Sequence, residues 1–581
     1  MTSELWAAEL RKQRRAELAE LGELAPPQDE YKWWPQGPEH AYMDDDAWWP
    51  LAELLHGVIT LIDLEFSCHS QFPPCLLRVL HESHPYCRLH ITTFEISSLL
   101  DESLDTHERD LVASPCLREV YVHYGFDEPA EQHLQICALL RMTVGATPNL
   151  SKVRLRYHED GLPPASRQSL EDPRHVLPPL HPNEPQTPIK IASLTTLELG
   201  RFAECNGRAV MTWDDLAIWN KYTDFSALHV LKLMKGIDPS ALAWAATNCS
   251  FNSLQTLVLY LDYEEDDNLM NDKCLEVSEL LSSLPPLAEL KICGGLSSSN
   301  FRACLQRHAS SLRTLWIGEV GKLCGESFDF AAVKTMLEYP LSFLQNLVLP
   351  IKRSKGDQDE VTIYKILGGL PRLQTLSLTL DCSDYSAFPV IQEDEAGREP
   401  EENKGSAHKG SRDSSPDSFY QQVYHLRNRG DDAIRRQPCF GHIRDAIINI
   451  AVDAKLAHDI YRKISSVKSI TSWLLERLEL RPTGGGQFGE ELGTDAELNL
   501  VLNQVGQHWL VRRMSTPEDC DSVGLTEVDR RLTTTHKYGV RGVSFRPRLQ
   551  ALLQNIWQCD CREENHWLNM WRSLPLSETG T

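Results

Sequence analysis

SLTTLELG at residues 193–200, SLQTLVLY at 253–260, SLRTLWIG at 311–318 and RLQTLSLT at 372–379 are nearly interchangeable stretches of one chain. Each contains the hexad apolar-x-x-apolar-x-apolar, which begins at the second residue quoted. Looser copies carry the same hexad through most of the sequence. The first apolar residues of all copies are Leu61, Leu117, Leu150, Leu194, Leu228, Leu254, Leu287, Leu312, Leu344, Leu373 and Leu475. A motif that recurs in this way indicates an array of repeats.

The spacing of the hexads and the segments between them indicate strand-and-helix units. From Leu194 to Leu373 successive first residues are 34, 26, 33, 25, 32 and 29 positions apart, close to the period of leucine-rich repeats. Apolar residues three or four apart predict helices that begin near Glu131, Asp272, Ser299 and Asp359, with Ser299 and Asp359 as the helix caps. A set of unrelated strands in an ordinary α/β domain is the alternative, which the regular spacing disfavours.

The period of a strand decides where the hexad residues point. Because successive side chains alternate between the two faces, positions four and six of the hexad point into the core and positions three, five and seven face outward. One unit cannot bury its apolar side alone and must stack on its neighbours. The sequence therefore predicts an α/β leucine-rich-repeat solenoid, curved, with a parallel inner sheet, outer helices and a capping C-terminal segment.

Composition divides the chain into four predicted regions. Residues 1–47 hold a charged helix and a segment rich in Trp and Pro, and residues 48–391 hold the solenoid with a Pro-rich loop at 159–188. Residues 392–430 are polar and charged, which predicts a disordered linker. Residues 431–581 are expected to form an amphipathic helix from Arg444, the final repeat at Leu475, a strand from His508, and a Trp-rich helix from Arg546 to Leu574 that completes the cap.

Charge and cysteine usage limit the class of protein. The formal net charge of -24 disfavours nucleic acid and anionic membranes as partners. The charged N-terminus lacks the apolar stretch of a signal peptide, and no later apolar run is long enough to cross a bilayer, so an intracellular location in the cytoplasm or nucleus is expected. The sixteen cysteines are scattered and mostly single, which indicates free thiols.

Motifs that suggest catalysis are weak in this sequence. Gly484, Gly486 and Gly489 follow a predicted strand, but the acidic residue that a dinucleotide site needs about 20 positions later is missing. Cys559, Cys561 and His566 could supply three ligands to zinc, but no CxxC or HxxxH partner stands nearby to complete a tetrahedral site. The pair His81 and His84 has the wrong spacing for a zinc protease. We therefore predict no catalytic residues, no metal site and no cofactor.

The outward positions of the central hexads are unusually apolar, which suggests where a partner binds. Fifth positions in this region include Val258, Trp316 and Val348, and seventh positions add Met234 and Tyr260. Large aromatic residues within a charged rim are typical of protein-binding hot spots. The predicted partner-binding residues are Lys232, Met234, Val258, Tyr260, Lys291, Trp316 and Val348. Alternatively, the linker or the Pro-rich loop of the same chain covers this face.

Several segments resemble a family of filamentous-fungal F-box and leucine-rich-repeat proteins. They are LIDLEFSC at 61–68, QFPPCLLRVL at 71–80 and HPYCRLHI at 84–91, and later INIAVDAKLAHDIYRKI at 448–464, LERLELRPTGGGQFG at 475–489 and HWLVRR at 508–513. In that family the F-box binds a Skp-type adaptor, and the repeats present a substrate to a cullin-RING ubiquitin ligase. The F-box itself is absent or degenerate, because no LP-x-E start precedes Trp48.

These observations favour a protein without chemistry of its own that binds another protein on its inner face. The resemblance implies an F-box-type substrate receptor, or its remnant, of a cullin-RING ubiquitin ligase. Two alternatives stay open: an enzyme with a C-terminal nucleotide or zinc site, and an assembly scaffold unrelated to ubiquitin.

Overall fold

The computed structural model describes much of the repeat region and parts of the C-terminal segment. The described residues are 45–68, 71–96, 98, 105–124, 129–157, 193–201, 211–261, 270–294, 296–318, 327–382, 447–484, 501–502, 504–513, 523–527, 553, 556–557 and 570–577. The charged N-terminal segment, the Pro-rich loop at 159–188 and the linker at 392–430 lie outside them. The chain forms two compact units, Met1–Tyr260 and Leu261–Thr581.

The described strands of the first unit pair in chain order, and all of them are parallel. They are β1 (Asp63–Phe66), β2 (Arg88–Ile91), β3 (Leu117–Tyr124), β4 (Lys152–Tyr157), β5 (Thr196–Arg201), β6 (Val230–Gly236) and β7 (Thr256–Tyr260). Parallel neighbours need a crossover connection. Helix α3 (Asp45–His56) precedes β1, and the described crossover helices are α4 (Pro74–Ser83), α5 (Thr106–Val112), α6 (Pro129–Arg141), α8 (Trp213–Tyr222) and α9 (Pro239–Asn248).

The second unit continues the same alternation of strands and helices and ends with two antiparallel strands. Its strands β8 (Glu289–Cys293), β9 (Thr314–Gly318), β10 (Asn346–Lys352), β11 (Thr375–Asp381) and β12 (Arg477–Thr483) pair in parallel. Strands β13 (Trp509–Arg513) and β14 (Val523–Glu527) then add to β12 in antiparallel fashion. Its helices are α10 (Met270–Ser283), α11 (Ser298–His308), α12 (Phe330–Lys334), α13 (Gln358–Gly368) and α17 (Ala454–Ser465). The strand predicted from His508 is thus confirmed, with an antiparallel direction.

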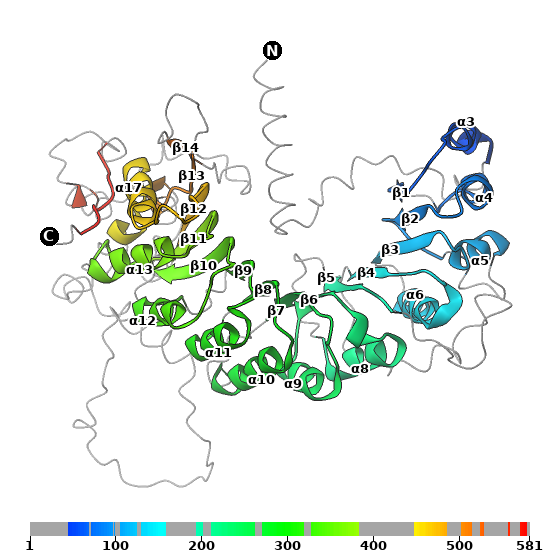
Figure 1. The fold of residues 1–581 in the computed structure, drawn as a ribbon, viewed down its shortest axis with the longest axis horizontal. Helices are drawn as coiled ribbons and strands as arrows, with labels where there is room; N and C mark the ends of the chain where they lie inside the picture. Colours follow the sequence, from blue (N-terminus) through cyan, green and yellow to red (C-terminus); the bar gives the residue numbers. More distant parts are fainter. Residues whose placement is uncertain are drawn as a thin grey trace, which may run out of the picture. The chain divides into compact units, whose positions relative to one another are not determined.

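Within each unit the described helices lie on one side of the strands (Figure 1). Burial alternates on strands such as β9, as the hexad requires. Leu315 and Ile317 are at most 1% exposed and point toward the helices, whereas Thr314 and Trp316 are partly exposed. The residues between the buried ones point to the opposite side of the sheet, which we call the helix-free face. The parallel strands and the alternation confirm the predicted mixed α/β architecture.

The structure places two predicted helix caps differently. Helix α11 is capped by Ser297, whose hydroxyl accepts from the backbone N–H of Asn300, and α13 is capped by Asp357, whose carboxylate accepts from that of Glu360. Both caps lie two positions before the predicted Ser299 and Asp359. The apolar periodicity locates a helix but does not specify the residue at which it begins, because the first turn contains few buried residues.

The amphipathic helix predicted from Arg444 is interrupted. Residues 447–450 are helical, Val452 forms an isolated parallel bridge to Gly506, and a new helix α17 begins after Asp453. The Asp453 carboxylate accepts from the N–H of Leu456 at 2.8 Å and so starts α17. The Trp-rich helix was predicted to extend to Leu574. The end of that prediction is wrong, because residues 571–577 are not helical.

Strand β2 is a repeat strand that the hexad list omits. Its hexad begins at Tyr86, which is 92% exposed, rather than at a buried aliphatic residue. The long step from Leu61 to Leu117 therefore contains an additional strand. Among the helices of the described residues, none combines the length and the apolar character that crossing a membrane requires.

Candidate binding surface

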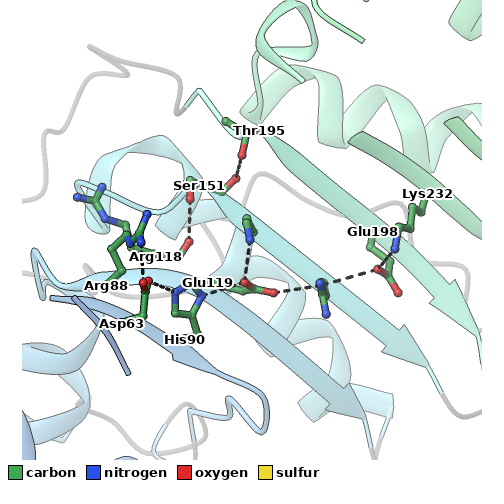
Figure 2. Close-up of polar contacts among 11 residues, drawn as sticks. Asp63, Arg88, His90, Arg118, Glu119, Ser151, Thr195, Glu198 and Lys232 are labelled. Atoms are coloured by element: carbon green, nitrogen blue, oxygen red, sulfur yellow. Dashed lines mark hydrogen bonds and ion pairs between the residues drawn. The ribbon is translucent and has the colours of Figure 1, made fainter. Parts of the chain in front are cut away.

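The helix-free face of the first unit carries a row of alternating charges that runs from β1 to β6 (Figure 2). The outward residues of neighbouring strands lie side by side in the parallel register. Glu119 lies beside Lys152, Arg154 beside Glu198, and Glu198 beside Lys232. We call this row, Asp63, Arg88, His90, Glu119, Lys152, Arg154, Glu198 and Lys232, the charge ladder.

The first half of the charge ladder connects β1, β2 and β3. Arg88 Nη2 lies 2.6 Å from Asp63 Oδ2, and both side chains are half exposed. The imidazole of His90 lies between two carboxylates, with Nε2 3.3 Å from Asp63 Oδ1 and Nδ1 2.9 Å from Glu119 Oε2. Each contact joins residues of different strands, so the ladder fixes the strands relative to one another.

The second half connects β3 to β6 through two carboxylates. Glu119 is 3.3 Å from Lys152 Nζ and 3.1 Å from Arg154 Nε. Glu198 is 3.8 Å from Arg154 Nε and 3.3 Å from Lys232 Nζ. Arg154 therefore bridges two acidic residues on the strands either side of its own.

The surroundings of the ladder carboxylates favour their charged forms. Burial alone raises the pKa of Glu119, but the hydrogen bond with His90 and the charges of Arg154 and Lys152 outweigh burial and lower the pKa overall. The hydrogen bond from Arg88 lowers the pKa of Asp63. Both carboxylates are therefore ionised at neutral pH.

Hydroxyl groups at the start of the strands add a second set of contacts between repeats. Ser151 Oγ donates to the carbonyl of Arg118 at 3.2 Å, and Thr195 Oγ1 donates to the carbonyl of Ser151 at 3.1 Å (Figure 2). In the second unit Ser311 Oγ donates to the carbonyl of Leu287 at 2.7 Å. Ser151 and Thr195 occupy the second position of their hexads, whereas Ser311 directly precedes Leu312, the first residue of its hexad.

The seven predicted partner-binding residues belong to strands of both units. Lys232, Met234, Val258 and Tyr260 lie on β6 and β7, and Lys291, Trp316 and Val348 lie on β8, β9 and β10. The structure thus gives two sets, one in each unit. Within the second set, Trp316 lies beside both Lys291 and Val348 in the strand register.

The predicted residues are less exposed than the sequence suggested. Val258 and Val348 are buried, at 7% and 9% exposure, and the other five are partly exposed. The fifth hexad position thus faces away from the helices, but its access to solvent depends on the side chains of the neighbouring strands. Val348 lies between Trp316 and Ser377, which limits its contact with water.

The sequence reasoning missed most of the charge ladder. Glu119 and Lys152 occupy third hexad positions, and Arg88 and His90 lie on the omitted strand β2. A usable signal was present, because acidic and basic residues alternate at the third and fifth positions of consecutive hexads. The second unit has a similar arrangement at its last repeat, where Glu479 on β12 contacts Arg481 at 2.8 Å and His508 at 2.8 Å.

Among the described residues no three His, Cys, Asp or Glu side chains are grouped so as to hold a metal ion. His81 contacts Ser114 Oγ and His84 contacts the carbonyl of Leu55, each at 2.8 Å, so both have structural contacts. Burial raises the pKa of the Cys304 and Cys382 thiols to about 12, which makes them unreactive.

The other motifs considered for catalysis fall elsewhere. Gly484 is described and adopts a positive φ of 83° at the end of β12. Gly486, Gly489, Cys559, Cys561 and His566 lie outside the described residues.

No family model and no curated protein matches this chain. The geometry of the candidate surface is therefore the guide to its function. That geometry provides a sheet face lined by paired charges in the first unit, and one that includes Trp316 in the second.

Proposed function

We propose that this chain is a leucine-rich-repeat protein without chemistry of its own, which binds another protein on its helix-free faces. One observation carries the proposal. Parallel sheets are normally covered on both faces, yet the described helices of each unit cover only one. A partner that docks on the other face completes the usual layer arrangement.

The side chains on these faces suit protein recognition. Met234 and Tyr260 in the first unit and Trp316 in the second are large and partly exposed. Charged neighbours such as Lys232 and Lys291 lie on adjacent strands. Aromatic anchors within a polar rim contribute much of the energy of protein interfaces.

We propose further that the bound protein is a substrate of a cullin-RING ubiquitin ligase. Support comes from the resemblance of residues 48–99 and of the last repeat to fungal F-box and leucine-rich-repeat proteins. In this proposal the repeats hold the substrate, and a Skp-type adaptor links the chain to the ligase.

Affinity capture of the full chain from its native cells tests both proposals. The variant Tyr260→Ala with Trp316→Ala should keep its thermal midpoint but lose the captured partner, because both side chains lie outside the core. Leu275→Ala, an exposed position on α10, is the control and should retain it. Unchanged capture by the double variant would refute binding at these faces.

The ligase proposal has its own readout in the same experiment. A Skp-type adaptor and a cullin should be enriched with the wild-type chain, and the partner should become ubiquitinated. Stable partners that never become ubiquitinated would instead identify a scaffold.

A further inference from the structure

The charge ladder contains more cations than carboxylates between β3 and β6. Lys152, Arg154 and Lys232 share the two carboxylates of Glu119 and Glu198. This group therefore carries an excess of one positive charge on the helix-free face. The chain as a whole has a formal net charge of -24, so the face differs in sign from the molecule that carries it.

The two signs of charge lie at different depths. Side-chain exposure is 39% for Lys152, 38% for Arg154 and 33% for Lys232, whereas it is 12% for Glu119 and 2% for Glu198. The carboxylates thus lie underneath and hold the cations in place. An approaching molecule meets ammonium and guanidinium groups first.

Because the cations lie above the carboxylates, some of their N–H groups can donate to a ligand. An ammonium group has three N–H donors and a guanidinium has five, and one carboxylate contact occupies only some of them. The cations are also held by their acidic neighbours, so less side-chain entropy is lost when a ligand binds. Tyr121 lies beside Arg154 in the register and is partly exposed, which adds apolar contact area.

We propose that the helix-free face of β3–β6 binds an acidic, extended peptide segment of the partner protein. Its carboxylates pair with Lys152, Arg154 and Lys232, and its apolar side chains pack on Tyr121 and Met234. This inference rests on the proposed function and specifies the chemistry of its partner.

A short peptide fits the electrostatics better than a long polyanion. At physiological salt a charge is screened over about 8–10 Å, so a peptide on the face senses mainly the local cations. Nucleic acid and anionic membranes extend well beyond the face and meet the acidic remainder of the molecule.

Fluorescence anisotropy with the full chain tests the proposal. The probe is a fluorescein-labelled synthetic peptide of alternating Glu and Thr, and the same peptide with Lys for Glu is the reference. We expect salt-dependent binding of the acidic peptide only. Lys152→Gln with Lys232→Gln should weaken that binding about tenfold, since each exposed ion pair contributes roughly threefold.

The control double variant is Arg302→Gln with Lys463→Gln, which removes the same charge from helices α11 and α17. Its affinity for the acidic peptide should stay within about twofold of the wild-type value, because the removed charges lie on helices and not on the helix-free face of β3–β6. An equal loss in the control would show a general charge effect and overturn the proposal.

Other outcomes would also overturn it. Tighter binding of oligothymidylate or of phosphatidylserine vesicles through the same lysines would assign the face to nucleic acid or membrane. The peptide could also bind only after Glu393, Asp394 and Glu395 are replaced by Gln, Asn and Gln. That result would assign the face to the chain's own acidic segment. If the lysine variants keep partner capture and the acidic peptide does not bind, this inference fails while the proposed function stands.

Discussion

The indole ring of Trp316 occupies the space beside Gly318 on the same strand. A β-carbon at Gly318 would lie 2.3 Å from Cη2 and 2.5 Å from Cζ2 of that ring. The absence of a side chain at Gly318 therefore allows Trp316 to lie against β9 on the helix-free face.

Gly318→Ala should displace the indole and lower the free energy of unfolding by about 1–3 kcal/mol, as overpacking does. Urea denaturation of the full chain measures this. In a Trp316→Ala background the same change should be neutral or slightly stabilising, since alanine restricts the unfolded chain. Equal destabilisation in both backgrounds would show that the ring does not occupy this space.

The buried pair of Arg353 and Glu360 supports a second prediction. Arg353 Nη1 donates to Glu360 Oε1 at 2.9 Å, and neither side chain is exposed. Glu360 also accepts from the hydroxyl of Tyr364 and from the backbone N–H of Gly356, both at 2.7 Å. Glu360→Gln leaves a buried guanidinium without its counter-charge and should destabilise the chain by about 3 kcal/mol or more.

The exposed pair of Arg302 and Glu338 provides the matched control. These side chains are each 56% exposed and 3.9 Å apart. Arg302→Gln should change stability by less than about 1 kcal/mol in the same urea titration. Similar effects at the two pairs would contradict the role assigned to burial.

The last repeat should make stability depend on acid pH. Burial raises the pKa of Glu479, but the hydrogen bond with His508 and the charge of Arg481 outweigh it and bring the pKa to about 2. A depressed carboxyl pKa gives stability that is complete above the usual value of 4.5 and is lost as the pH falls toward 2. The contribution is on the order of 3 kcal/mol.

Glu479→Gln removes this dependence. The difference in urea midpoint between wild type and variant should be largest above pH 4.5 and should shrink between pH 4.5 and 2. A difference that stays constant across this range would contradict the account of the Glu479 cluster.

The N-cap of α17 also holds the C-terminal tail. Asp453 Oδ2 accepts from the N–H of Ser573 at 2.9 Å, and the N–H of Asp453 donates to Ser573 Oγ at 2.6 Å. Asp453→Ala should cost about 1 kcal/mol and speed hydrogen exchange in both α17 and residues 571–577. The control is Asp329→Ala at the cap of α12, which should speed hydrogen exchange in its own helix alone. Faster exchange at residues 571–577 in this control would contradict the proposed link between Asp453 and the tail.

The hexads predicted the strands and their register well. Tyr121, Arg154, Glu198, Lys232 and Val258 are fifth positions, and they pair with one another from β3 to β7. Trp316, Val348, Ser377 and Glu479 do so from β9 to β12. The period of a strand follows from residues close in sequence, and the repetition of the hexad aligns consecutive strands in parallel.

Features that depend on neighbouring strands could not be predicted as well. The burial of Val258 and the contacts of Glu119 are set by side chains more than twenty positions away, whose packing the hexad does not specify. The break at Asp453 depended on a local cap, which a continuous apolar pattern concealed.

The central claim is that the partner docks on the helix-free faces, and site-specific photocrosslinking in native cells tests it most directly. Benzoylphenylalanine replaces Lys232 or Lys291 on those faces, and Leu275 or Lys463 on helices α10 and α17. The account predicts adducts with the same partner from the two strand positions and none from the helix positions. Adducts formed from the helix positions and absent from the strands would contradict it.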